Sequence, residues 1–278
     1  MAIADSAQDV DQVHLHSESG EGFLLAFGRS PKDRRGERDY KHPAKPQQHW
    51  PAGLTGSHPE HPPTIGVDVG VQWTVSPNKA LAHLRRDPVL RRLIRQIGPY
   101  AIEYAPANFA TLARCIVYQQ VSGKVAAKLY ARLQEAVATA GELQPADVLQ
   151  ASREQLRAVG LSRSKIHYLR SLAEACMEGR LRLEELSALP DEEVIRILTR
   201  LPGIGLWTVQ MYLIFALKRP DVLPSTDLGI RVAVQQAYQL AQLPTPKQVE
   251  RLGEPWHPYA TVASWYLWRS LGDGAGLY

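Results

Sequence analysis

The chain has 278 residues, 45% of them hydrophobic, which is enough to bury the core of one large domain or two moderate ones. Residues 1–70 hold 7 basic and 10 acidic side chains, whereas residues 71–278 hold 25 and 18, so the formal net charge of +4 belongs to the second part. The basic charge of the second part suits a phosphate-bearing partner. The two cysteines exclude a four-cysteine zinc or iron–sulfur site. No apolar run reaches the roughly 18 residues that are needed to span a membrane. We therefore expect a soluble intracellular protein with no membrane partner and no cofactor.

The first 70 residues predict a polar, disordered extension. They are rich in proline and charge, and they carry six of the nine histidines at irregular spacing, which does not favour a metal site. Residues 65–75 alternate in polarity and predict one short strand.

From Ser76 onward the pattern is helical almost throughout. Helix starts are marked by Ser76-Pro77 and Asp87-Pro88, and stops by glycine–proline pairs such as Gly98-Pro99. We predict an all-α domain over residues 71–278, with helices over 76–86, 87–97, 109–121, 124–139, 146–150, 153–159, 164–178, 182–186, 191–200, 206–217, 228–240, 247–252 and 259–270.

The most informative stretch is Leu201–Asp227, LPGIGLWTVQMYLIFALKRPDVLPSTD. It predicts a tight glycine hairpin between two helices, of which the second is apolar on nearly all sides, then a proline-rich loop and an acid. Two glycines at a helix start bring bare backbone N–H groups close to an anion, and the helix dipole adds partial positive charge there. The stretch therefore predicts a phosphate contact.

This pattern, together with other segments, resembles a known family. The segments are Asp87-Pro88 with Gly98-Pro99, Ile116–Ser122, Gly160–Ser162 with Lys165, and Trp256–Tyr259 leading to Tyr266–Arg269, in that order across residues 77–270. The chain resembles the helix-hairpin-helix DNA glycosylases, in the 3-methyladenine DNA glycosylase II (AlkA-like) branch and in a compact form without the N-terminal sheet domain. The resemblance implies two helical subdomains around a DNA-binding cleft.

Asp227 matches the catalytic acid of the family. The residues alone favour an N-cap for the following helix, a role for which Ser225 and Thr226 also qualify. The two interpretations are compatible, because a helix N-terminus stabilises the charged carboxylate that cleavage of an N-glycosidic bond needs. Asp221 is interpreted as a loop residue.

The resemblance further implies how the bond is broken. Members that cleave the strand have a lysine at the second residue after the hairpin, where this chain has Trp207. A monofunctional enzyme that uses water is therefore implied, and the two cysteines disagree with the iron–sulfur branch.

Aromatic side chains predict a pocket for the damaged base. Trp207 and Trp268 match family pocket positions, and Met211 lies one turn after Trp207 on the same helical face. Ring faces attract cationic bases such as 3-methyladenine and 7-methylguanine. The alternative for each tryptophan is an ordinary place in the core.

DNA contacts are implied for two loops. Gly203, Ile204 and Gly205 form the phosphate cradle, where the family often holds a monovalent cation on hairpin carbonyls, here those of Leu201 and Ile204. Gln119, Gln120 and Ser122 form the loop from which a residue enters the gap left by a flipped nucleotide, and Gln120 aligns best with it. The alternative for the two glutamines is solvated amides.

One departure from the family is Ala260, where arginine is common after the Trp-x-Pro-Tyr motif. The expected function is a monomeric glycosylase that removes alkylated purines from duplex DNA. The alternatives are removal of another lesion, such as uracil, hypoxanthine or ethenoadenine, and DNA binding without chemistry. The expected location is the cytoplasm of a bacterium or the nucleus of a eukaryote.

Overall fold

The computed structural model describes residues 76–272. The predicted N-terminal extension, its histidines and its short strand fall outside this range. Within it the chain is entirely helical, as predicted, and none of its helices is long and apolar enough to cross a membrane. The α-helices are α1 (Pro77–Leu84), α2 (Pro88–Ile97), α3 (Phe109–Tyr118), α4 (Gly123–Val137), α5 (Pro145–Gln150), α6 (Arg153–Ala158), α7 (Arg163–Met177), α8 (Asp191–Leu198), α9 (Leu206–Phe215), α10 (Leu228–Ala237), α11 (Pro246–Gly253) and α12 (Ala260–Ser270), and the 3-10 helices are η1 (Leu183–Ala188) and η2 (Glu254–Trp256).

Local chemistry sets most helix starts. Asp87 begins α2 because its Oδ1 accepts hydrogen bonds from the backbone N–H groups of Val89 and Leu90, at 2.7 and 3.1 Å, and Pro88 supplies a helical φ. The other Asp87 oxygen accepts hydrogen bonds from Tyr238 and Trp256. This cap therefore also ties α2 to residues near the far end of the chain.

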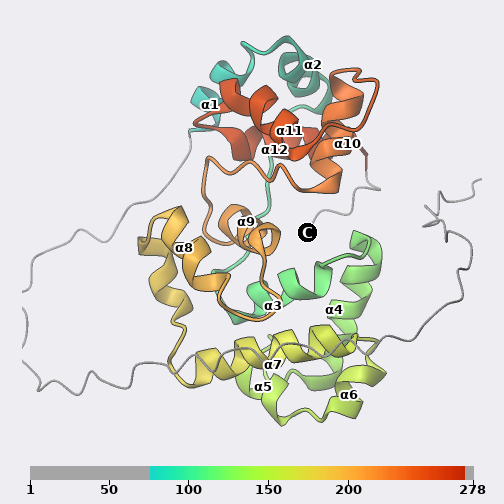
Figure 1. The fold of residues 1–278 in the computed structure, drawn as a ribbon, viewed down its shortest axis with the longest axis vertical. Helices are drawn as coiled ribbons and strands as arrows, with labels where there is room; N and C mark the ends of the chain where they lie inside the picture. The colour runs from blue at the N-terminus through green and yellow to red at the C-terminus, as the bar shows by residue number, and fades with distance from the viewer. Residues whose placement is uncertain (1–75, 273–278) are drawn as a thin grey trace, which may run out of the picture. The chain divides into compact units, whose positions relative to one another are not determined.

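The helices form two groups (Figure 1). In one group α2 packs against α12, α12 against α10, and α1 and α11 against η2. In the other, α3 packs against α4, α7 and α9, α7 also covers α5 and α6, and α8 pairs with α9. The first group, the terminal subdomain, therefore unites the two ends of the described chain, and the second, the central subdomain, is the continuous stretch α3–α9.

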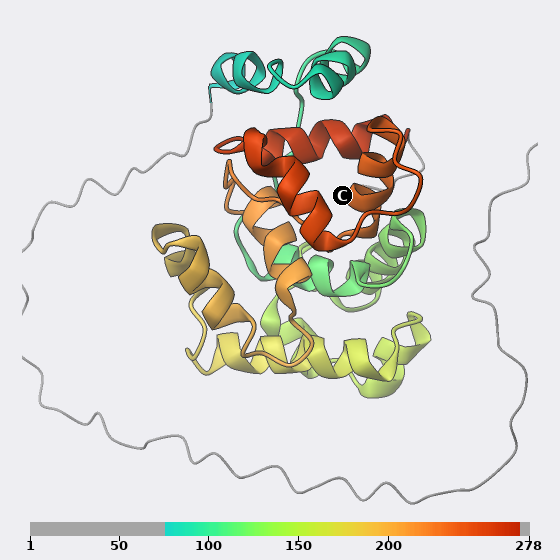
Figure 2. The same cartoon turned by 45° about the horizontal axis from the view of Figure 1, so that its top comes forward.

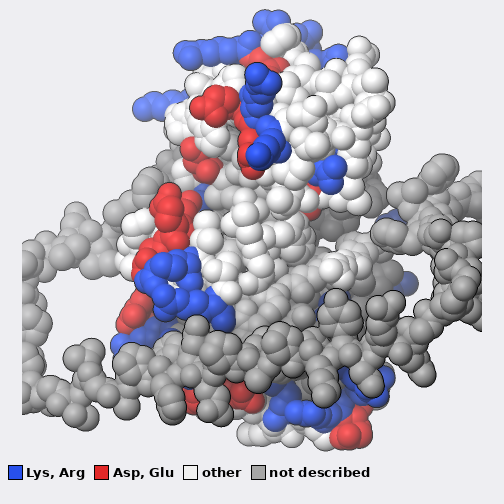
Figure 3. Space-filling view, viewed as in Figure 1, with Lys and Arg blue, Asp and Glu red and all other residues white. Residues whose placement is uncertain are grey.

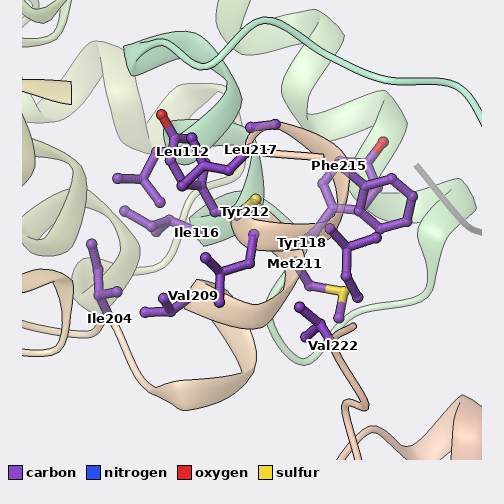
Figure 4. Packing of buried hydrophobic residues seen from close by; sticks show 14 of the residues in the cluster. Leu112, Ile116, Tyr118, Ile204, Val209, Met211, Tyr212, Phe215, Leu217 and Val222 are labelled. Atoms are coloured by element: carbon purple, nitrogen blue, oxygen red, sulfur yellow. The ribbon is translucent and has the colours of Figure 1, made fainter. Parts of the chain in front are cut away.

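The core of the central subdomain is built around α9. Residues 208–215 of this helix are buried except for Gln210, as its apolar sequence predicts. Figure 4 shows Tyr212 and Val209 facing Leu112 and Ile116 of α3. This packing fixes the helix that follows the glycine hairpin.

Helix α3 ends earlier than its sequence pattern predicts. The prediction ran to Val121, but the helix stops at Tyr118, because Gln119 is extended (ψ 131°) and Gln120 has a φ of +56°. A left-handed backbone at a residue other than glycine costs free energy, so the surrounding structure holds this turn in place.

Candidate active site

The hairpin between α8 and α9 is a tight turn that depends on Gly203. The N–H of Ile204 donates to the carbonyl of Leu201 at 3.2 Å, and Gly203 has a φ of +75°, the geometry of a type II turn with Pro202 at its second position. A Cβ at Gly203 would lie 2.1 Å from the ring of Tyr168 on α7. Both the backbone angle and the close approach of Tyr168 therefore require glycine.

Gln119 fastens the hairpin to the end of α3. Its Nε2 donates to the carbonyl of Gly203 and to Oγ1 of Thr208, each at 2.8 Å. Both N–H groups of this amide are thus engaged inside the protein. The predicted DNA contact of Gln119 stays a prediction, and the structure assigns the residue a bracing role that its sequence did not indicate.

The start of α9 is open to an anion. Gly205 precedes the helix without a side-chain cap, and nothing lies within 4 Å of where its Cβ would be. Leu206 in the first turn is 44% exposed. The first N–H groups of a helix seek acceptors, so this end suits the phosphate that the sequence predicts.

Asp227 is the N-cap of α10. Its Oδ1 accepts a hydrogen bond from the backbone N–H of Ile230 at 2.8 Å, so Asp227, rather than Ser225 or Thr226, begins the helix. Two indoles also bind the carboxylate: Trp207 Nε1 donates to Oδ2 at 2.8 Å and Trp268 Nε1 to Oδ1 at 2.9 Å. The carboxylate therefore receives three N–H donors, and the two from indoles come from different subdomains.

The surroundings of the carboxylate leave little room. A Cβ at Gly229 would lie 3.0 Å from Asp227 Oδ1 and 3.3 Å from the Trp268 ring. A larger residue at position 229 would push on both groups. Gly229 was not identified from the sequence, although a glycine two residues after the capping acid is the signal that could have indicated it.

The predicted pocket residues differ in exposure. Trp207 is partly buried, whereas Trp268 and Met211 are 2% and 1% exposed. Trp268 stacks on Phe215 with ring centroids 6.0 Å apart, and Figure 4 shows Met211 among Phe215 and Val222. Trp207 and Trp268 thus meet at Asp227, and the place of Met211 in a base pocket stays a prediction.

The loop between α9 and α10 is anchored at both sides. Asp221 Oδ1 lies 2.7 Å from His257 Nδ1 and accepts a hydrogen bond from the N–H of Ala260 at 3.1 Å. Arg219, 4% exposed, forms an ion pair with Asp191 at 2.9 Å. Asp221 is a loop residue, as interpreted, and it braces the fully buried Ala260, at the position where the sequence departs from the family.

The remaining predicted contacts lie at the surface. Gln120 and Ser122 are exposed in the turn before α4, and the Ser122 side chain makes no cap bond to that helix. The carbonyl oxygen of Leu201 accepts the hydrogen bond that closes the hairpin turn, and its second lone pair is left to bind a cation. The monovalent cation on the carbonyls of Leu201 and Ile204 is compatible with this chemistry and stays a prediction. Among residues 76–272 no cluster of His, Cys, Asp and Glu could hold a metal ion.

The glycine hairpin is followed by one buried helix, a braced loop and a helix-capping aspartate. This arrangement defines a class of helix-hairpin-helix proteins that have an acid at the junction of two helical subdomains. The family model described as HhH-GPD superfamily base excision DNA repair protein matches residues 113–258. The chain belongs to this superfamily.

Individual relatives agree with this assignment. The chain is 34% identical over 213 residues to DNA-3-methyladenine glycosylase 1 of Schizosaccharomyces pombe, covering 74% of this chain and 93% of the relative. A solved structure of the 3-methyladenine DNA glycosylase of that yeast in complex with abasic DNA matches with a TM-score of 0.66 at 35% identity, covering 69% of this chain and 96% of the other. The DNA-3-methyladenine glycosidase of Bacillus halodurans matches with a TM-score of 0.60 at 34% identity, over 74% and 93% of the two chains.

Proposed function

We propose that the protein is a monofunctional DNA glycosylase that removes alkylated purines, such as 3-methyladenine and 7-methylguanine, from duplex DNA. The single observation that carries the proposal is the Asp227 carboxylate, which caps a helix and accepts one indole N–H on each oxygen. The relatives named as 3-methyladenine glycosylases support the class of substrate.

DNA would be held at two places. The uncapped start of α9 and the hairpin residues Gly203–Gly205 would bind a backbone phosphate. Gln120, exposed on a strained turn, would fill the space left by a nucleotide rotated out of the helix. The bracing of the hairpin by Gln119 keeps these two contacts at a fixed separation.

Asp227 would act on the sugar. As the bond between C1′ and the base nitrogen breaks, its electron pair leaves with the base, and positive charge develops on the deoxyribose. A fixed carboxylate stabilises that charge, and a water molecule then bonds to C1′ and releases a proton to the solvent. Because N–H donors already bind both oxygens, Asp227 is held in a fixed position, which suits a group that stabilises charge on the sugar.

The base would be recognised chiefly by its charge. An N-alkylated purine is cationic in DNA and leaves as a neutral molecule, so it needs little protonation by the enzyme. Trp207, the less buried of the two indoles, would offer its ring face to that cation while its N–H holds Asp227. A tryptophan at this position also supplies no amine to attack the sugar, so strand cleavage is not expected.

A panel of duplexes that each carry one lesion tests the proposal. We expect release of 3-methyladenine and 7-methylguanine, slow or no release of uracil, and strand breaks only after alkali is added. Release of uracil, hypoxanthine or ethenoadenine at the higher rate would change the assigned substrate. Binding of all duplexes with release from none would refute the glycosylase activity.

A further inference from the structure

A strongly basic surface lies on α1 and α2, outside the site described above. Residues 76–98 contain six basic side chains and one acidic, a net charge of +5 in a chain whose total is +4. Figure 3 shows these blue side chains along the edge of the molecule that α1 and α2 form. All six are exposed; Arg92 donates to the carbonyl of Ala237, and the other five, here called the α1–α2 basic patch, are Lys79, Arg85, Arg86, Arg91 and Arg95.

Stability does not explain the patch. Asp87, the one acid within it, uses Oδ1 to cap α2 and Oδ2 to accept from Tyr238 and Trp256. The ion pairs found in the described part of the chain all involve other residues. Arg91 and Arg95 stand four residues apart, a like-charge spacing that destabilises a helix.

The buried side of α2 needs none of these charges. Leu90, Leu93 and Ile94 face the core, and α2 packs on α12 through that side. Neutral polar residues at 91 and 95 would satisfy the fold equally well. The charges are therefore best explained by a partner that is itself anionic.

Helix α2, which carries Arg91 and Arg95, touches the end of α10 that lies away from Asp227. Asp227 caps the N-terminus of α10, whereas Arg92, the neighbour of Arg91, donates to the carbonyl of Ala237 at its C-terminus at 2.7 Å. Ten residues of α-helix separate these ends by about 15 Å. Both views of the fold show α1 and α2 at the end of the molecule away from α6 and α7 (Figures 1 and 2). The hairpin between α8 and α9 belongs to the central subdomain and the patch to the terminal subdomain, so the two are separate surfaces.

The chemistry of the patch fits a nucleic-acid backbone better than a protein. Four of its five members are arginines, whose guanidinium groups bind phosphates in pairs of hydrogen bonds. Protein interfaces are built around apolar or aromatic anchors. In residues 76–272 the large hydrophobic side chains that are exposed all lie beyond position 100, and none belongs to α1 or α2.

We infer that the α1–α2 basic patch binds the phosphate backbone of a second DNA segment while the hairpin holds the first. The inference takes from the proposed function only that the protein binds DNA. Two separate anion-binding surfaces would let the protein pass directly from one duplex to another without first becoming free.

Direct transfer has a kinetic signature that tests the inference. The full-length protein is bound to a short labelled duplex without a lesion, and its dissociation rate is measured against rising concentrations of unlabelled duplex. The variant is R91Q/R95Q. The matched control is K247Q/R251Q, which removes two exposed charges at the same spacing from α11, a helix that also carries Glu250.

We expect the dissociation rate of the wild type and of the control to rise with competitor concentration, and that of R91Q/R95Q to stay nearly constant. For R91Q/R95Q, the slope of the logarithm of the competitor-driven dissociation rate against the logarithm of the salt concentration should also be smaller by about two, because two phosphate contacts are lost. The inference would be overturned if the dissociation rate depended equally on competitor in all three proteins, or if it did not depend on competitor in the wild type. The partner of the patch would then be an acidic protein.

Release of an alkylated base from a short duplex under single-turnover conditions is measured in parallel. We expect R91Q/R95Q to retain it, because its substitutions are at exposed positions of α2, a helix that supplies no donor to Asp227. If the wild type transfers between duplexes but releases no base, the inference stands and the proposed function fails. If the wild type releases base but does not transfer directly between duplexes, the proposed function stands and the inference fails.

Discussion

Trp207 and Asp227 belong to different subdomains, and a hydrogen bond of 2.8 Å from the indole Nε1 to Oδ2 joins them. The same carboxylate is bound from the terminal subdomain by Trp268. The acid therefore sits where the two subdomains meet, and its position depends on both.

Replacing Asp227 with asparagine should abolish base release while the fold and DNA binding persist. Asparagine caps a helix as well as aspartate does, so α10 should be retained. Loss of the charge should slow release from a 7-methylguanine duplex by at least about 100-fold. Asp221→Asn is the matched control, because it removes a charge from the same loop and keeps the oxygen that Ala260 needs. Wild-type release by the Asp227 variant would show that the acid lies elsewhere.

Trp207→Phe should separate the two roles of the indole. The ring face remains, but the donor to Asp227 Oδ2 is lost, and a hydrogen bond to a charged group contributes about 1.5–3 kcal/mol. We expect the single-turnover rate to fall roughly tenfold to a hundredfold with little change in lesion affinity. In the Asp227→Asn background the same substitution should have a much smaller effect. Equal losses in both backgrounds would argue against coupling between the two residues.

Gly203→Ala should damage the hairpin, and Gly205→Ala should not. The first substitution combines a left-handed φ, which costs about 1–2 kcal/mol, with a clash against Tyr168. The second adds a methyl group in open space. Thermal unfolding and affinity for a lesion-free duplex should both decrease for Gly203→Ala alone. Comparable behaviour of the two variants would contradict the geometry of the turn.

Gln120→Gly should make the protein more stable and slow the release of the base. Glycine adopts a φ of +56° without strain, so the free energy of unfolding should rise by up to about 1 kcal/mol. The side chain proposed to fill the gap in the duplex is lost, so base release should slow. Chemical denaturation and single-turnover kinetics on the same preparation measure the two effects. A variant that is both less stable and fully active would refute this account of the turn.

Asp147 should give the stability a measurable pH dependence. Burial alone would raise the pKa of this carboxyl, but hydrogen bonds from the Thr139 side chain and from the backbone N–H groups of Gln144 and Thr139 outweigh burial and hold the pKa below its usual value. A folded pKa below the unfolded value of about 3.9 stabilises the protein at neutral pH, and this contribution is lost as the pH falls through the folded pKa. The stability gap between the wild type and Asp147→Asn should therefore be constant above about pH 5 and narrow below pH 4. Glu135→Gln, at an exposed position of α4, should show a much smaller gap.

The sequence predicted those features that depend on neighbours along the chain. The starts of α2 and α10, the hairpin and the burial of α9 follow from caps, glycines and apolar spacing over a few residues. Asp227, Trp207 and Trp268 were identified through a motif resemblance, and the structure brings all three together.

Contacts between distant residues could not be predicted in this way. Gln119 and Gly203 lie 84 positions apart, and their hydrogen bond exists only because α3 packs on α9. The same holds for Tyr168 beneath Gly203. The end of α3 at Tyr118 was missed because a left-handed glutamine has no signal in the sequence. These features result from packing, which a linear pattern does not encode.

The terminal subdomain is assembled from both ends of the described chain, and this imposes an order on synthesis. When α2 leaves the ribosome, the helix that will cover Leu90, Leu93 and Ile94 is still more than 150 codons away. The central subdomain can pack first, while α1 and α2 wait with an uncovered apolar face. A protein shortened before Trp268 would present Asp227 with one indole instead of two, so the site is complete only after α12 has been made.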